Sequence, residues 1–180
     1  AMDDAAGGGH LSVVEWLHEK RLEGCTNAAM DKAAKGGHLD VVRWLRATRR
    51  VLECTATAMN CAAGGGHLSV VKWLYANGSH LPHDDHVKIT LQALDYAAAG
   101  GHIQVMKWLQ GNTNCSNERL ALDDFNRENL KTESINAMIL AAGNGHLAAV
   151  EWLHHNNLEG WAMDKCAMDL AALGGHLPVV

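Results

Sequence analysis

Proline and aromatic residues are scarce in this chain of 180 residues, which contains two prolines, two tyrosines and one phenylalanine. Together with an apolar content of 48%, this scarcity predicts a soluble helical protein rather than a β-rich one. No apolar run approaches the length that spans a bilayer, because charged residues interrupt the sequence throughout. The first ten residues also lack the basic start and the apolar core of a secretory signal.

What the chain does contain is one segment copied six times: Gly-His-Leu or Gly-His-Ile, two small aliphatic residues, and Trp-Leu. The sixth copy stops at Val180, before its Trp-Leu pair. We call the histidine of each copy the repeat histidine: His10, His38, His67, His102, His146 and His176. Successive repeat histidines are 28, 29, 35, 44 and 30 residues apart. A segment copied at such a period is one unit of a repeat protein, which is expected to act through a surface.

A second recurrent segment places alanine nine, five and four positions before each repeat histidine. In the segment that follows the histidine, apolar residues such as Leu39, Val42 and Leu45 stand three apart on one stripe of a helix. Each repeat is therefore predicted to be two short helices joined by a glycine turn. The predicted array of five full repeats and a truncated sixth has the boundaries 1–28, 29–57, 58–92, 93–136, 137–166 and 167–180. We expect both ends to be cuts through a longer array.

Recurrence favours structural over catalytic explanations for several residues. Hydroxyl residues ahead of the alanine segments are expected to cap the first helices: Thr26, Thr57, Thr90 and Ser134. Aspartates early in those helices suit the positive end of the helix dipole: Asp3, Asp31, Asp95 and Asp169. The glycine before each repeat histidine is expected to form a left-handed turn. No Gly-Lys-Ser/Thr follows the glycines, and no nucleophile stands at a recognisable spacing from a base, so we predict no enzyme and no cofactor.

Tryptophan recurs six positions after five of the repeat histidines. These residues are Trp16, Trp44, Trp73, Trp108 and Trp152. We expect their rings to pack between helices of adjacent repeats. The alternative, a row of exposed rings that stack on bases or sugars, requires high solvent exposure.

The blocks AAGGGHLSVV, AAKGGHLDVV, AAAGGHIQVM and AAGNGHLAAV resemble the A-A-x-x-G-H-L-x-V-V core of ankyrin repeats, and the resemblance spans essentially the whole chain. It implies an all-α, ankyrin-like helical solenoid, with the repeat histidines hydrogen-bonded across neighbouring turns. Two features mark a divergent member: Ala-Met-Asp replaces Thr-Pro-Leu-His, and the uninterrupted spacing is 28 to 30 residues, below the usual period of about 33. We therefore expect short connections, such as 21–25, in place of full β-fingers at 20–27 and 48–56.

The resemblance also implies a concave recognition surface on the first helices. Carried over position by position, it would include Asp4, Lys32, Lys35, Tyr96, Ala99 and Asn144. Two inserts, residues 77–92 and 111–136, are further binding candidates because solenoid insertions emerge at one edge, and the second contains Phe125. The first insert holds the candidate metal ligands His80, His83, Asp84 and His86, which are residue types that coordinate zinc.

Charge and cysteine patterns limit the remaining possibilities. The basic cluster at 43–50 is not repeated and has acidic neighbours, which disfavours nucleic acid as a partner. The five cysteines include no Cys-x-x-Cys pair, which disfavours zinc and redox motifs. Cys25 and Cys54 hold equivalent positions in adjacent repeats, about 8–10 Å apart and beyond disulfide reach. A reducing, cytoplasmic location fits best, although the sequons at Asn77 and Asn114 leave secretion open.

The sequence thus predicts a monomeric, non-enzymatic scaffold for protein–protein interaction, with another protein as partner and no membrane association. Two alternatives remain open. One is an interaction module fused to a catalytic or targeting domain outside these residues. The other is a metal-binding loop at 80–86.

Overall fold

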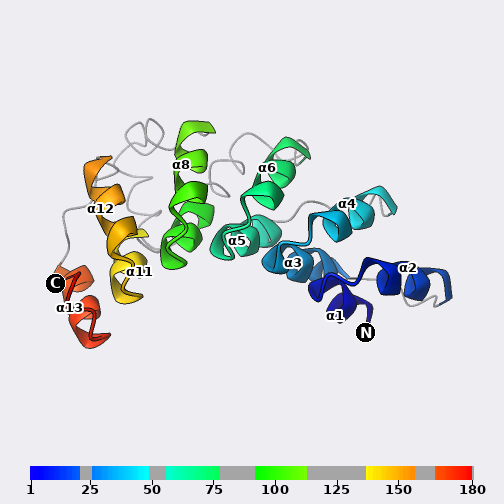
Figure 1. Ribbon diagram of the computed structural model, residues 1–180, viewed down its shortest axis with the longest axis horizontal. Coiled ribbons are helices and arrows are strands. Elements are labelled where there is room, and N and C mark those ends of the chain that lie inside the picture. The colour runs from blue at the N-terminus through cyan, green and yellow to red at the C-terminus, as the bar shows by residue number, and fades with distance from the viewer. Residues whose placement is uncertain (21–25, 49–55, 78–91, 113–136, 157–164, 180) are drawn as a thin grey trace, which may run out of the picture. The chain divides into compact units, whose positions relative to one another are not determined.

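The structure is a computed structural model that describes residues 1–20, 26–48, 56–77, 92–112, 137–156 and 165–179 (Figure 1). The chain forms two compact bodies: the N-terminal body, Ala1–Leu81, and the C-terminal body, Pro82–Val180. The described residues form helices and turns, and none of them lies in a strand.

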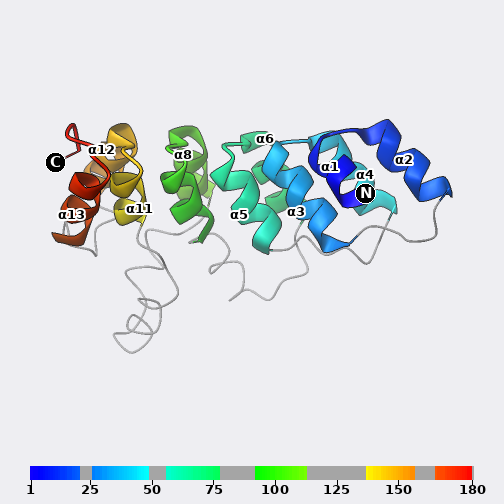
Figure 2. The ribbon, with the colours of Figure 1, turned by 90° about the horizontal axis from the view of Figure 1, so that it is seen from below.

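The N-terminal body consists, in its described residues, of three successive helix pairs. These are α1 (Met2–Gly7) with α2 (Leu11–Lys20), α3 (Asn27–Gly36) with α4 (Leu39–Thr48), and α5 (Ala56–Gly64) with α6 (Leu68–Asn77). The first helices pack on one another, α1 against α3 and α3 against α5, so α3 lies between the other two in both views (Figure 1, Figure 2). The second helices α2, α4 and α6 contact one another in the same order.

The C-terminal body repeats this arrangement. Residues 92–99 are helical and precede α8 (Ile103–Asn112), which is followed by α11 (Ala137–Gly143), α12 (Leu147–His155) and α13 (Lys165–Leu173). Here α11 packs against α13, and α12 contacts α8. The predicted fold class, an all-α ankyrin-like solenoid, is confirmed. Short connections were predicted within 20–27 and 48–56, and residues 21–25 and 49–55 of these ranges lie outside the described residues. The repeat boundaries stay predictions.

One hydrogen-bonded turn ends the first helix in all six repeats. The backbone N–H of each repeat histidine donates to the carbonyl of the alanine five positions before it, over 2.8–3.0 Å. The N–H of the preceding glycine donates to the carbonyl of the alanine four positions before the histidine, over 3.0–3.2 Å. The six glycines have φ between 70° and 77°, which is the left-handed conformation of a Schellman motif. The prediction of a left-handed glycine turn is confirmed.

The core follows the same register. The alanine nine positions before the repeat histidine is buried in each repeat where it is described beyond the first, and Ala33 and Ala34 are fully buried where first helices meet. Small side chains are needed here because close helix packing leaves no room for larger ones. From the second helices, Val41, Val42 and Leu45 are also fully buried, so both helices of a pair contribute one apolar face.

The helix starts confirm one predicted cap and correct another. Thr26 is the N-cap of α3, and its Oγ1 accepts a hydrogen bond from the Ala28 N–H over 3.2 Å. Thr57 is not a cap, because α5 already begins at Ala56. Counting twelve positions before the repeat histidine, the residue equivalent to Thr26 is Thr55. Thr55 lies outside the described residues, as do the predicted caps Thr90 and Ser134.

The predicted role of the aspartates at the helix dipole is correct only in part. Asp3 lies in the first turn of α1. Asp31 and Asp169 are each the fifth residue of their helices, which have no acidic residue in the first turn. Because the dipole effect fades beyond the first turn, that explanation is wrong for these two residues.

Candidate interaction surface

The first helix of each repeat buries one face and leaves another open to solvent. The position six before the repeat histidine is exposed or partly exposed in every repeat: Asp4, Lys32, Cys61, Tyr96, Leu140 and Leu170. Tyr96 retains 48% of its surface. Three positions further on, Lys35 is exposed and Ala99 is partly exposed. Five of the residues predicted from the ankyrin resemblance therefore lie on this open face of the first helices: Asp4, Lys32, Lys35, Tyr96 and Ala99.

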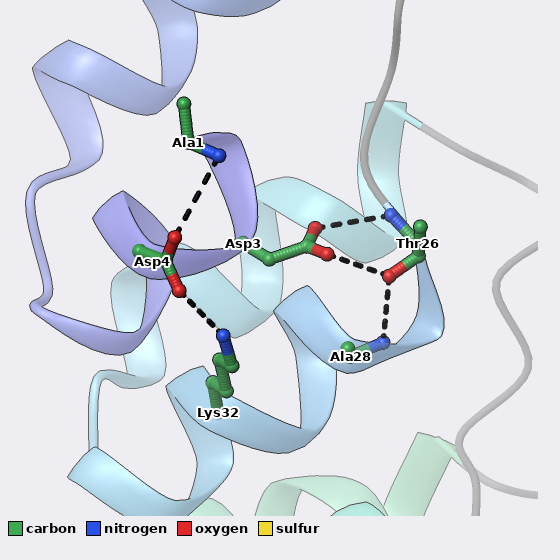
Figure 3. Close-up of polar contacts among 6 residues, drawn as sticks. All are labelled: Ala1, Asp3, Asp4, Thr26, Ala28 and Lys32. Carbon is green, nitrogen blue, oxygen red and sulfur yellow. Dashed lines mark hydrogen bonds and ion pairs between the residues drawn. The ribbon is translucent and has the colours of Figure 1, made fainter.

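An ion pair joins two of the predicted surface residues (Figure 3). Lys32 Nζ in α3 donates to Asp4 Oδ1 in α1. This hydrogen bond and the opposite charge lower the pKa of Asp4 and raise the pKa of Lys32. Both side chains are exposed, so solvent screens the pair and its stabilising effect is small. Asp4 and Lys32 thus neutralise each other's charge. Lys35 is a second lysine on the same helix.

A hydrogen bond from a side chain to the backbone joins two other predicted residues, Asn144 and Ala99, between repeats. The Asn144 Nδ2 donates to the Ala99 carbonyl oxygen over 2.9 Å. This hydrogen bond joins the turn after α11 to the helix at 92–99, so Asn144 has a structural role besides any contact with a partner. Phe125 lies outside the described residues, and its role as a binding residue stays a prediction.

Asp3 makes a second contact between α1 and α3, which the sequence analysis did not predict. Asp3 Oδ1 accepts from the Thr26 backbone N–H over 3.1 Å, and Oδ2 accepts from the Thr26 hydroxyl over 2.7 Å (Figure 3). The partners are 23 residues apart. A sequence signal did exist, because both residues recur at fixed distances from the repeat histidine.

The repeat histidines belong to the framework. The ring of His38 lies against Gly9, and an added Cβ on that glycine would be 2.4 Å from the histidine Nδ1. The same contact joins Gly37 to His67 in the N-terminal body. In the C-terminal body it joins Gly101 to His146 and Gly145 to His176. The His67 Nε2 also lies 2.9 Å from the Lys35 carbonyl oxygen, so the hydrogen bond across turns that the resemblance implies is present there.

The tryptophans are mostly covered, as expected for packed rings. Trp44 meets His18 of the preceding second helix in an edge-on contact, with ring centroids 5.3 Å apart. Four of the five rings are partly buried: Trp44, Trp73, Trp108 and Trp152. Trp16 is the exception, with 57% of its surface exposed. One open ring does not make the row of platforms that stacking on nucleic acid requires.

An asparagine side chain forms a hydrogen bond at the C-terminal end of three of the second helices, which the repeat pattern did not predict. In each case the side-chain Nδ2 donates to the carbonyl oxygen of the tryptophan four residues earlier, over 2.7–2.9 Å. The pairs are Asn77 with Trp73, Asn112 with Trp108, and Asn156 with Trp152. This contact satisfies a carbonyl that a helix end would otherwise leave to water.

Metal binding and membrane insertion gain no support from the described ranges. Nowhere in them do three His, Cys, Asp or Glu side chains gather in a way that could hold a metal ion. The candidate ligands of the first insert lie outside these ranges, so the metal site at 80–86 stays a prediction. None of the helices in the described part of the chain is long and apolar enough to cross a bilayer.

Comparison with protein families agrees with the helix pairs and their turns. Two overlapping segments, residues 2–46 and 30–75, match the family described as "Ankyrin repeats (many copies)". Residues 2–75 therefore carry the sequence pattern of ankyrin repeats. Ankyrin repeats generally mediate protein–protein interactions and are typically non-enzymatic. No curated protein matches the chain.

Proposed function

We propose that this chain is a non-enzymatic interaction scaffold that binds another protein through the open face of its first helices. The observation that carries the proposal is the contrast within one helix. In α3, Ala33 and Ala34 are fully buried, while Lys32 and Lys35 beside them are exposed. The buried residues are constrained by packing, whereas the exposed ones are free to vary from repeat to repeat.

The residues on that face are suited to hold a protein surface. Tyr96 offers a large, rigid ring with a polar tip, a side chain enriched where binding energy concentrates. The partly exposed Leu140 and the exposed Leu170 occupy the equivalent positions in the next two repeats. Lys35 supplies a cation in the N-terminal body. Such a mixture of aromatic, apolar and charged groups fits a folded protein or a peptide segment.

Two tyrosines of similar exposure provide a matched test. Tyr96 lies on a first helix and is 48% exposed, whereas Tyr75 lies on the second helix α6 and is 37% exposed. With the full chain immobilised in a native extract, we expect Tyr96→Ser to reduce capture of a cross-linked partner about tenfold. Tyr75→Ser should leave that capture unchanged. Equal capture by both variants, or a larger loss from Tyr75→Ser, would refute the proposed face.

A second matched pair tests the N-terminal body separately. Lys35→Glu reverses a charge on the first helix α3, and Lys72→Glu reverses a charge on the second helix α6. Both lysines are exposed. Only the first should weaken capture. Circular dichroism of each variant checks that its helix content is retained. The monomeric state, the cytoplasmic location and the fused-domain alternative are not needed for these experiments and stay predictions.

A further inference from the structure

The junction between two successive repeats contains one recurrent contact, in which the repeat histidine of the later repeat lies against a glycine of the earlier one. An added Cβ on that glycine would be 2.4–2.7 Å from the histidine Nδ1 at Gly9, Gly37, Gly101 and Gly145. Each junction thus has two different sides. The later repeat presents an imidazole ring, and the earlier repeat presents a turn that must lack a side chain.

The first repeat leaves the histidine side of such a junction open. His10 is exposed, whereas the other five repeat histidines are partly buried. The alanine five positions before the histidine follows the same pattern, because Ala5 is partly exposed and its equivalents are fully buried. These equivalents are Ala33, Ala62, Ala97, Ala141 and Ala171. We call Ala5 and His10 the N-terminal edge.

The last repeat of this sequence leaves the glycine side open. Gly175 has φ of 73°, like the other turn glycines, but an added Cβ on it would have no atom within 4 Å. Three positions before the repeat histidine, Leu173 is 85% exposed. The equivalent residue one repeat earlier, Gly143, faces the next first helix, since its added Cβ would be 3.6 Å from the Leu170 Cβ. We call Leu173 and Gly175 the C-terminal edge.

The two edges are complementary and differ from each other. The C-terminal edge exposes the apolar side chain of Leu173, and Leu177 beside the same turn is 81% exposed. A terminal repeat that stands in water needs a polar outer face, and exposed apolar groups indicate an interaction surface. Because one edge offers a histidine ring and the other an open glycine turn, they fit each other rather than themselves. Such a contact is head-to-tail.

We propose that the C-terminal edge of one copy of this chain binds the N-terminal edge of a second copy, with the His10 ring against Gly175. A second copy is the partner that fits, because the contact continues the junction that the chain already makes between its own repeats. Association of this kind is open-ended, since each added copy presents a further free edge. It uses the edges and leaves the open face of the first helices to the proposed protein partner.

Sedimentation velocity of the full chain tests the proposal. The mean sedimentation coefficient should rise between about 1 µM and about 1 mM protein, where weak specific contacts form. Ala5→Glu places an unpaired charge in the contact and should raise the concentration of half-association at least about tenfold. His10→Ala removes the ring from an exposed position and should act in the same direction. Ala76→Glu adds the same charge at an exposed residue of α6 and should change nothing.

Gly175→Asn blocks the other edge while it retains the turn. Asparagine tolerates the left-handed conformation, and no atom of a single copy lies near the new Cβ. Its side chain would instead occupy the place of the His10 ring, so association should weaken at least about tenfold. The matched control is Gly111→Asn in α8, where an added Cβ also has no atom within 4 Å. Circular dichroism checks the helix content of every variant.

The decisive measurement is a mixture of the two kinds of edge variant. An N-terminal-edge variant, Ala5→Glu or His10→Ala, retains a free C-terminal edge, and Gly175→Asn retains a free N-terminal edge. At concentrations where neither variant associates alone, the mixture should form a dimer that grows no further. A single species of the unsubstituted chain at every concentration, as the predicted monomeric state implies, overturns the proposal and leaves the edges to a repeat of another chain. Failure of folded variants to form the mixed dimer, or equal weakening by the two controls, also overturns it.

Discussion

The N-terminal and C-terminal bodies share one framework and differ in what their first helices expose. Both use the same turn, in which a glycine of one repeat lies under the histidine ring of the next. Six positions before the repeat histidine, the N-terminal body carries the charged residues Asp4 and Lys32, followed by Cys61. The C-terminal body has Tyr96, Leu140 and Leu170 at that position. The glycine–histidine turn is the same in both bodies because its backbone conformation and its packing constrain the residue types.

The difference shows which positions of a repeat can vary. A framework glycine must adopt a positive φ and must also leave space for a histidine ring, so two independent requirements fix its identity. The residue six positions before the repeat histidine is subject to neither requirement, since its side chain is exposed or partly exposed. Polar and apolar faces can therefore be built on one backbone.

The largest expected effect comes from substituting a framework glycine in either body. Gly37 has φ of 77°, and its Cβ would lie 2.4 Å from the His67 ring. Gly145 has φ of 75°, with the His176 ring 2.5 Å away. We expect Gly37→Ala and Gly145→Ala each to lower the free energy of unfolding by at least about 2 kcal/mol, from backbone strain and steric overlap together. Urea denaturation followed by tryptophan fluorescence measures this loss.

Two other glycines separate strain from overlap. Gly175 has φ of 73° but no atom within 4 Å of its added Cβ, so Gly175→Ala should cost only the strain, about 1–2 kcal/mol. Gly111 lies within helix α8, and its added Cβ would also have no atom within 4 Å. Gly111→Ala should be neutral or slightly stabilising, because alanine favours a helix. If Gly37→Ala costs no more than Gly175→Ala, the histidine contact does not constrain the framework.

An effect of similar size is expected from substituting a buried methionine eight positions before the repeat histidine. Met30 in the N-terminal body is fully buried, whereas Met168 in the last repeat is 40% exposed. Met30→Ala should lower the free energy of unfolding by about 2–5 kcal/mol at most, because it leaves a cavity. Met168→Ala should cost less than about 1 kcal/mol. Thermal denaturation of both variants measures the two losses. A larger loss from Met30→Ala would show that burial of the methionine determines its contribution to stability.

Local turn chemistry was predictable from the sequence, whereas contacts between repeats were not. The left-handed turn at Gly37 follows from glycine before a recurrent histidine, and the cap at Thr26 follows from a hydroxyl ahead of an alanine segment. The cap assigned to Thr57 was wrong because the helix begins at Ala56, and propensity alone does not fix a helix start to within a residue or two.

The role of Asp3 was missed for a different reason. Its partner Thr26 lies in the next repeat, 23 residues away, and a dipole argument considers only the residue's own helix. Comparing the same position across all six copies supplies the missing information, because residues that touch across a junction must have compatible chemistry. The open face of the first helices could be located by resemblance, but its ion pair could not, since Asp4 and Lys32 are 28 residues apart.

The smallest expected effect concerns that ion pair, which has no counterpart at Tyr96. Lys32 lowers the pKa of Asp4 below its ordinary value of 3.8. A carboxyl with a lowered folded-state pKa contributes stability above its unfolded pKa and loses it as the pH falls through the folded pKa. Because both groups are exposed, the effect on stability should be slight, while the pKa itself should respond clearly. In an NMR titration, Lys32→Met should raise the pKa of Asp4 toward its ordinary value, and Lys35→Met should leave it unchanged. An equal response to both substitutions would mean that the general positive charge of α3, rather than the pair with Lys32, sets the Asp4 titration.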